Sequence, residues 1–183
     1  ETVRMGYNEY KAWKKEQVQA MVRQYDFAEF KYLIQVCVEC AKTVDKRQNL
    51  LSTGLKDAIE ACAENPGLYI DVVEAYLQAD TPYDISACAI LKHLFSRMTA
   101  EEVMEFIEAH DFTHKNTWLW YFYTELPEEQ VSVEWAERFL KYLSNIPEIS
   151  ESPYRPLSKI EKYERVDKKI VLRASSVLLS HYA

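Results

Sequence analysis

The sequence predicts an all-α protein of about ten helices, arranged as antiparallel helical hairpins stacked in a short solenoid or as a compact multi-helix bundle. The 183 residues include only three glycines and six prolines, and β-sheets need glycine at turns and bulges. Apolar residues recur at helical spacing along nearly the whole chain. Caps and prolines divide this pattern into short segments, which is typical of helices joined by short loops.

The first two helices are predicted over residues 7–23 and 27–44. The expected buried face of the first carries five apolar residues: Tyr10, Trp13, Val18, Met21 and Val22. Asp26 precedes the second helix, and Glu29 follows three residues later, which is the spacing of a capping box. The second helix therefore has a well-defined start.

Three more helices are expected over 45–63, 66–78 and 84–97. Pro66 stands in the first turn of the middle one, where its missing N–H costs nothing, and Asp84 precedes the last as a candidate cap. Thr99 and Glu102 form another capping box before a helix ending at residue 109. A loop is then predicted at 111–115.

The C-terminal part is expected to contain four helices, over 116–125, 132–145, 157–166 and 167–182, with Ser132 capping the second. Three prolines and two serines mark residues 147–156 as a loop. The predicted organisation is thus a helical-repeat array at 1–146, this loop, and a C-terminal helical pair at 157–183 that packs on the array. Because the chain starts at Glu1 and stops in a helical pattern, we expect it to be cut from a longer chain.

A shift of 49 residues aligns the apolar positions of two predicted hairpins. The superimposed residues are Tyr69, Val72, Val73, Leu77, Leu91 and Leu94 on Trp118, Tyr121, Phe122, Leu126, Leu140 and Leu143. Over residues 26–145 the chain resembles HEAT-like helical-repeat arrays in unit length and leucine pattern. That resemblance implies a scaffold or recognition surface within a larger multidomain protein.

Charge is segregated along the chain. Residues 1–56 carry a net charge of +3, residues 57–151 carry −14 and residues 152–183 carry +4. An acidic body disfavours nucleic-acid binding, which needs a basic face against the phosphates. The acidic stretch is interpreted as a solubilising surface, and the separation of signs also predicts salt-sensitive self-association.

Composition excludes several other classes. The chain has no glycine-rich phosphate loop, and no apolar run is long enough to span a membrane. Its four cysteines lie within apolar helical patterns, which favours a reducing, cytoplasmic location. Cys37 and Cys40 have the CxxC spacing, but the pair lies in mid-helix without a second ligand pair, so we interpret both as structural. No cofactor is expected.

Six consecutive large apolar residues at 118–123 form the densest feature. They point to all sides of a helix, so this helix is either surrounded in the core or presents aromatic residues to a partner. Tyr and Trp are enriched at binding hot spots. The candidate contact residues are Trp118, Trp120, Tyr121 and Tyr123.

An alternative, enzymatic hypothesis rests on potential metal ligands. His93 followed by the adjacent His110 and Asp111 resembles the ligand order of helical HD-type metal phosphohydrolases, although this chain carries the His-Asp pair in a predicted loop. The resemblance implies a metal site made by these three residues, with His114 as a further ligand. Loop and capping hydrogen bonds account for the same residues without a metal.

A third hypothesis concerns basic residues near the C-terminus. Acidic residues alternate with them, so ion pairs along the helices account for part of the cluster. The remainder is a candidate contact for nucleic acid or an acidic partner. The residues are Lys159, Lys162, Arg165, Lys168, Lys169 and Arg173. The preferred prediction is a non-catalytic protein-interaction, scaffold or sensing module with a protein partner.

Overall fold

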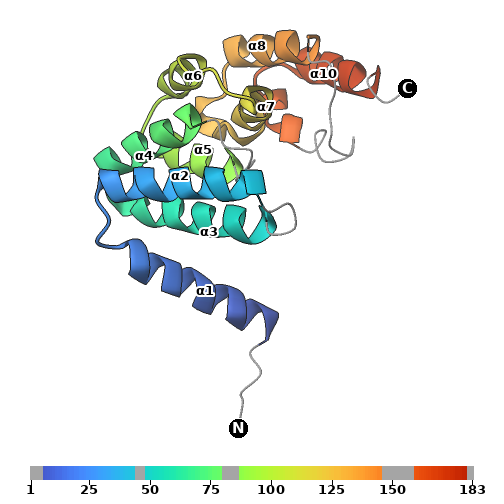
Figure 1. Ribbon diagram of the computed structural model, residues 1–183. Helices are drawn as coiled ribbons and strands as arrows, with labels where there is room; N and C mark the ends of the chain where they lie inside the picture. The colour runs from blue at the N-terminus through green and yellow to red at the C-terminus, as the bar shows by residue number, and fades with distance from the viewer. Residues whose placement is uncertain (1–5, 44–47, 80–86, 146–158, 181–183) are drawn as a thin grey trace. The chain divides into compact units, whose positions relative to one another are not determined.

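The computed structural model describes residues 6–43, 48–79, 87–145 and 159–180, and within these ranges every regular element is helical (Figure 1). The all-α prediction is therefore confirmed. The elements, with η marking short 3-10 helices, are α1 (Tyr7–Val22), α2 (Phe27–Thr43), α3 (Gln48–Ala61), η2 (Cys62–Glu64), α4 (Pro66–Gln78), α5 (Ala87–Phe95), α6 (Ala100–Glu108), α7 (Lys115–Glu125), η3 (Glu128–Gln130), α8 (Val133–Leu143), η4 (Glu161–Arg165) and α10 (Lys168–Ser180).

The predicted helix starts at Asp26, Thr99 and Ser132 are confirmed. The Glu29 amide donates to the Asp26 carboxylate at 2.9 Å, and the Asp26 amide donates to the Glu29 carboxylate at 2.8 Å. The Thr99 and Glu102 pair is equally reciprocal, and Ser132 accepts a hydrogen bond from the amide of the third residue of its helix. These bonds satisfy amides that have no partner within the helix. Asp84 and the loop 147–156 lie outside the described residues.

The chain forms two compact units. Unit 1 comprises residues 1–93 together with 110–114, and unit 2 comprises 94–109 together with 115–183. The division therefore falls inside the range 1–146 that the sequence predicts as one array. The C-terminal helical segment belongs to the same unit as α6, α7 and α8.

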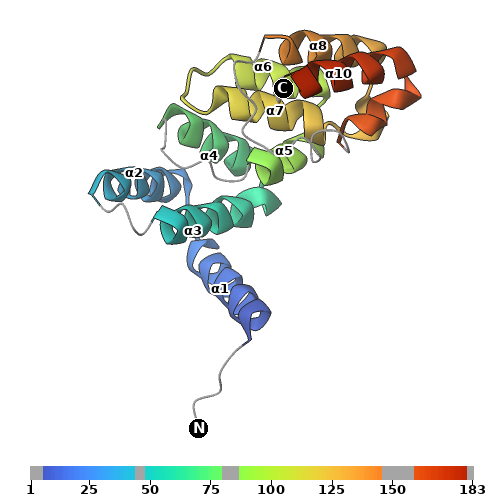
Figure 2. The same cartoon turned by 90° about the vertical axis from the view of Figure 1, so that its right-hand side faces the viewer.

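Unit 1 is held together by contacts between neighbouring and next-but-one helices. Helix α1 packs against α3, α2 packs against both α3 and α4, and α3 contacts α4 (Figures 1 and 2). Its core is apolar, and the buried Tyr69 hydroxyl donates to the carbonyl oxygen of Ile90 at 3.4 Å. This bond ties α4 to α5.

Helix α1 differs from its predicted burial. Only Val22 of the expected buried face is enclosed, whereas Tyr10, Trp13 and Met21 are 48%, 45% and 53% exposed. The expectation was wrong because α3 covers only one side of α1. On that side Lys14 and Lys15 form ion pairs with Asp57 and Glu60, at 3.8 and 3.3 Å.

Unit 2 is built around an aromatic core. Helix α6 packs against α7, and α10 lies beside α8 and follows η4 (Figure 2). The Phe122 ring lies 5.3 Å from Phe95 and 5.1 Å from Trp135, while Tyr123 stacks on Phe139 at 5.0 Å. Aromatic pairs at such distances contribute energy beyond the area that they bury.

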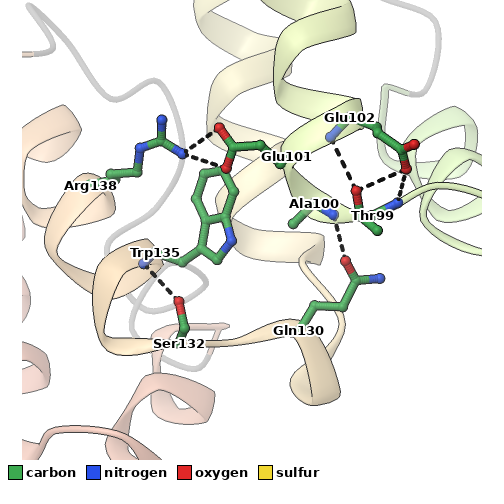
Figure 3. A network of polar contacts seen from close by, with 8 residues as sticks. All are labelled: Thr99, Ala100, Glu101, Glu102, Gln130, Ser132, Trp135 and Arg138. Atoms are coloured by element: carbon green, nitrogen blue, oxygen red, sulfur yellow. Dashed lines mark hydrogen bonds and ion pairs between the residues drawn. The ribbon is translucent and has the colours of Figure 1, made fainter.

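A polar network connects α6 to the segment containing η3 and α8 (Figure 3). Arg138 donates to both carboxylate oxygens of Glu101, at 3.2 and 3.0 Å, and its guanidinium lies 4.5 Å from the centre of the Trp135 ring. The amide of Ala100 donates to the side-chain oxygen of Gln130 at 2.6 Å. The start of α6 is thus fixed by side chains from its own capping box and from residues 130–138.

The segment predicted as an α-helix at 157–166 differs from expectation, because residues 161–165 form the 3-10 helix η4. A 3-10 helix completes a turn in three residues and occurs in short pieces. In this turn Lys162 and Tyr163 both reach the end of α7. The local conformation therefore accompanies a tertiary contact that the local sequence does not reveal.

Candidate protein-interaction surface

The aromatic residues of α7 lie in the core of unit 2. Trp118, Trp120 and Tyr123 are 1%, 7% and 6% exposed, so the hypothesis that they form an accessible binding patch is wrong. Tyr121 is half-buried, and the ammonium group of Lys159 lies 5.5 Å from the centre of its ring. Of the two alternatives left open for this segment, the structure supports the surrounded core helix.

The C-terminal basic residues do not form one accessible patch. The Lys162 ammonium donates to the carbonyl oxygens of Thr124 at 2.9 Å and Leu126 at 2.6 Å, where α7 ends. Lys159 pairs with Glu125 beside it. The last carbonyl groups of a helix lack partners within the helix and carry partial negative charge, which explains why cations gather there.

Two further basic residues are also paired. Arg165 lies 2.8 Å from the carboxylate of Glu128, and Lys168 lies 3.7 Å from that of Glu164. Of the six predicted residues, only Lys169 and Arg173 are exposed without an ion pair to another described residue. Lys159 and Lys162 therefore form a clamp on the end of α7, whereas the other four residues stay exposed.

Burial changes the acid–base properties of this clamp. Removal from water, together with the nearby Lys159 ammonium, lowers the pKa of Lys162 to about 8. Glu125 and Glu128 oppose this shift but do not cancel it. A neutral amine keeps two N–H groups, which is the number that the Thr124 and Leu126 carbonyl oxygens accept.

The residues of the enzymatic hypothesis are not assembled into a metal site. The His93 ring packs edge-on against Tyr69 at 5.6 Å, and Nε2 of His110 lies 3.4 Å from the Glu74 carboxylate. Asp111 is exposed and His114 is half-buried in the same loop region. Among the described residues, no three His, Cys, Asp or Glu side chains are placed to hold one metal ion.

The CxxC pair lies along α2. Cys37 is 5% exposed and Cys40 is half-buried. Burial raises the pKa of the Cys37 thiol, and the neighbouring Cys40 adds to this effect. A raised pKa makes the thiolate scarcer at neutral pH, which is the opposite of what a reactive redox cysteine needs.

The accessible apolar surface lies elsewhere, on unit 1. Ten large hydrophobic residues are exposed in the described part of the chain, and seven of them fall between residues 7 and 36. Four belong to α1, where Tyr7, Tyr10, Trp13 and Met21 are between 45% and 73% exposed. These four residues are named the α1 face. Their spacing predicts an apolar stripe, but sequence alone assigned that stripe to the core.

The α1 face is preorganised. The rings of Tyr10 and Trp13 lie 6.0 Å apart, and the Lys11 ammonium lies 4.9 Å from the Tyr7 ring. Lys14 and Lys15 of the same helix form ion pairs with Asp57 and Glu60 of α3, which hold α1 in place. The aromatic residues therefore stand on a helix that is already formed and fixed.

Comparisons with known proteins add no assignment, since no family model, no curated protein and no solved structure matches this chain. Within the described ranges, no helix is both long enough and apolar enough to cross a membrane.

Proposed function

We propose that this protein is a non-catalytic protein-interaction module whose binding surface is the α1 face. The observation that supports this proposal is that Tyr10, Trp13 and Met21 are about half exposed on a helix that packs against α3. Large aromatic side chains left in water are costly to solvate, and Tyr and Trp dominate the energy of many protein interfaces. A partner that covers this stripe gains that burial without having to order the helix.

Under the same proposal the helical hairpins of this chain form a HEAT-like array that acts as a scaffold within a larger protein. The contacts of α1 with α3, and of α2 with α4, support this arrangement, because stacked hairpins bring next-but-one helices together. We also propose a cytoplasmic location. Cys37 and Cys62 support it by packing as small apolar residues, which suits a reducing compartment.

The test begins with a photo-reactive amino acid at position 13, introduced in the native cells, to identify the protein that contacts the α1 face. The partner is then purified, and its Kd is measured for the unchanged chain and for Tyr10→Ser/Trp13→Ser. We expect at least a hundredfold loss of affinity, because about 3 kcal/mol is an ordinary loss for two interface aromatics. The melting temperature should change little, since both side chains are already half exposed.

Val133→Ser is the matched control. Val133 is an exposed apolar residue of α8 in unit 2, 48% accessible, so its replacement removes a similar kind of surface far along the chain. It should leave the Kd unchanged. Equal affinity of the double variant and the control, or unfolding of the double variant, would refute the α1 face as the binding surface.

A further inference from the structure

The outer side of α10 combines two exposed leucines with two exposed cations. Leu172 and Leu179 are 70% and 54% exposed and stand seven residues apart, so they lie on the same side of the helix. Ile170 and Ala174 point the other way, with only 3% and 2% exposure. This apolar stripe is thus separate from the side of α10 that builds the core.

Lys169 and Arg173 flank the leucines and are one helical turn apart. Both are exposed, and neither forms an ion pair with any carboxylate of the described ranges. The other four basic residues of the C-terminal cluster are all engaged. We name Lys169, Leu172, Arg173 and Leu179 the α10 ridge, a convex surface that is apolar in the middle and positive along one side.

A concave surface, in contrast to the convex α10 ridge, lies on α2. A groove with a volume of about 540 Å³ runs along its outer side. It is lined chiefly by Tyr25, Asp26, Glu29, Tyr32, Leu33 and Val36, which we name the α2 groove. Tyr32 is 69% exposed and Val36 is 38% exposed, whereas Phe30 and Ile34 on the inner side of the same helix are buried.

The charge of the α2 groove is negative. The Asp26 and Glu29 carboxylates accept hydrogen bonds from each other's amide, which fixes both at the start of α2. Both residues are exposed, and no described Lys or Arg is within ion-pair distance of either. The groove therefore offers an apolar floor with two fixed anionic groups, and the α10 ridge offers leucines with two cations.

We propose that the α10 ridge of one molecule binds in the α2 groove of a second copy of this chain. Three observations favour a second copy as the occupant: the signs of charge are opposite, both surfaces are apolar at the centre, and both occur on the same chain at equal concentration. A copy with a net charge of −7 is repelled in most orientations, so the positive ridge also selects the orientation of approach.

The proposed contact is heterologous, with the ridge of each molecule bound in the groove of the next. Each molecule keeps one free groove or one free ridge after the first contact, so association continues beyond two copies as concentration rises. This surface is distinct from the α1 face.

The experiment uses sedimentation equilibrium of the full chain from 10 to 500 µM in low salt. We expect the unchanged chain to exceed its monomer mass of 21.5 kDa, and to exceed twice that mass at the highest concentration. The ridge variant Lys169→Glu/Arg173→Glu and the groove variant Tyr32→Glu should each remain monomeric. All three positions are exposed, and circular dichroism verifies that each variant is folded.

Mixing the two variants is the decisive step. Each variant keeps the surface that the other has lost, so an equimolar mixture should form a complex of two chains. This complex should not grow further, because the ridge and the groove that remain free in it are the two mutated ones. A monomeric wild-type chain at every concentration, variants that still associate alone, or a mixture that stays monomeric would each overturn the proposal.

The α1 face supplies the control that separates this proposal from the proposed function. Trp13→Ser should associate with itself as the unchanged chain does, and Val133→Ser should do the same. Loss of self-association in Trp13→Ser would place the contact on α1 and overturn the pairing of ridge and groove. Failure of the partner experiment alone would leave self-association unaffected.

Discussion

The hydroxyl group of Tyr163 donates a 2.8 Å hydrogen bond to the main-chain carbonyl oxygen of Tyr123, forty residues earlier in the chain. Both side chains are buried, and the ring of Phe139 lies within 5.2 Å of each. The bond joins η4 to the last turn of α7, next to the two carbonyl oxygens that accept from Lys162. It is a buried contact between the C-terminal segment and the aromatic core.

Replacing Tyr163 by Phe tests this contact. The ring remains, but the Tyr123 carbonyl oxygen loses its partner in a buried site, so we expect the free energy of unfolding to fall by about 1–3 kcal/mol. Urea denaturation measures the change. Tyr32→Phe is the control, because Tyr32 is 69% exposed and its hydroxyl is accessible to water. Equal stability of Tyr163→Phe and the unchanged chain would show that the hydrogen bond contributes nothing.

The lowered pKa of Lys162 predicts an unusual dependence of stability on pH. Its pKa is about 8 in the folded protein and 10.5 for an ordinary lysine, so between these values the unfolded chain binds more protons than the folded one. The free energy of unfolding should therefore rise with pH above about 8. In Lys162→Met this contribution should disappear, and chemical denaturation at pH 7.5, 8.5 and 9.5 measures it.

Lys168→Met is the control for that experiment, because the Lys168 side chain is 80% exposed. Its stability should follow the unchanged chain at each pH. Measurements stop below pH 10, because burial raises the pKa of Tyr123 to about 12 and that of Tyr142 further still. Stability from these tyrosines is present below their unfolded pKa near 10 and is lost above it. If the stability of Lys162→Met depended on pH in the same way as that of the unchanged chain, the lowered pKa of Lys162 would be disproved.

The capping box of α6 gives a third prediction. Hydrogen bonds from the Thr99 amide and hydroxyl lower the pKa of the Glu102 carboxyl. Thr99→Ala should destabilise the protein by about 1 kcal/mol, whereas Thr99→Ser should retain most of the stability. NMR titration should show the Glu102 pKa closer to the ordinary glutamate value in Thr99→Ala. An unchanged pKa would mean that the hydroxyl does not contribute to it.

Thiol reactivity distinguishes structural from redox cysteines. Cys37 and Cys62 are 5% and 6% exposed, while Cys40 and Cys88 are half-buried. Alkylation of the folded protein by iodoacetamide at pH 8, followed by peptide mass spectrometry, should modify Cys40 and Cys88 first. The raised pKa of Cys37 slows its reaction further. Preferential labelling of Cys37 would revive the interpretation of the CxxC pair as a reactive site.

Helix starts were predictable from sequence because their determinants are local. The carboxylate of Glu29 and the hydroxyl of Thr99 each act on an amide three residues away, so a window of four residues contains the whole interaction. Pro66 in the first turn of α4 is another case. Element type and helix starts can therefore be inferred in the absence of tertiary information.

The exposure of aromatic residues was not predictable in the same way. Trp13 was expected in the core and is 45% exposed, whereas Trp120 was a candidate for a binding surface and is 7% exposed. Trp13 stands in a predicted apolar stripe, and Trp120 stands in a run of apolar residues that point to all sides of α7. Which side of a helix is covered depends on neighbours far along the chain, and α1 is covered by α3 alone among its strong contacts. The spacing of apolar residues shows which side of a helix is apolar, but not which part of the protein covers that side.

The role of the segregated charges was also not predictable from the sequence. From sequence, the basic ends and the acidic middle suggested contacts between molecules. The structure instead pairs opposite charges within each unit. In unit 1, Lys14 and Lys15 form ion pairs with Asp57 and Glu60. In unit 2, Lys159 and Arg165 form ion pairs with Glu125 and Glu128. Within the C-terminal cluster, Lys169 and Arg173 form no ion pair with another described residue, so they remain available for an intermolecular role.

The clamp at the end of α7 also sets an order of events during synthesis. Lys162 follows its two carbonyl acceptors by 36 and 38 residues, and at 5–20 residues per second a ribosome needs roughly two to eight seconds to add them. During that interval the aromatic residues of α7 have been made, but the segment that closes over Tyr123 has not. Unit 2 therefore completes its fold only after η4 has been added, and the aromatic helix α7 of a nascent chain lacks this cover until then.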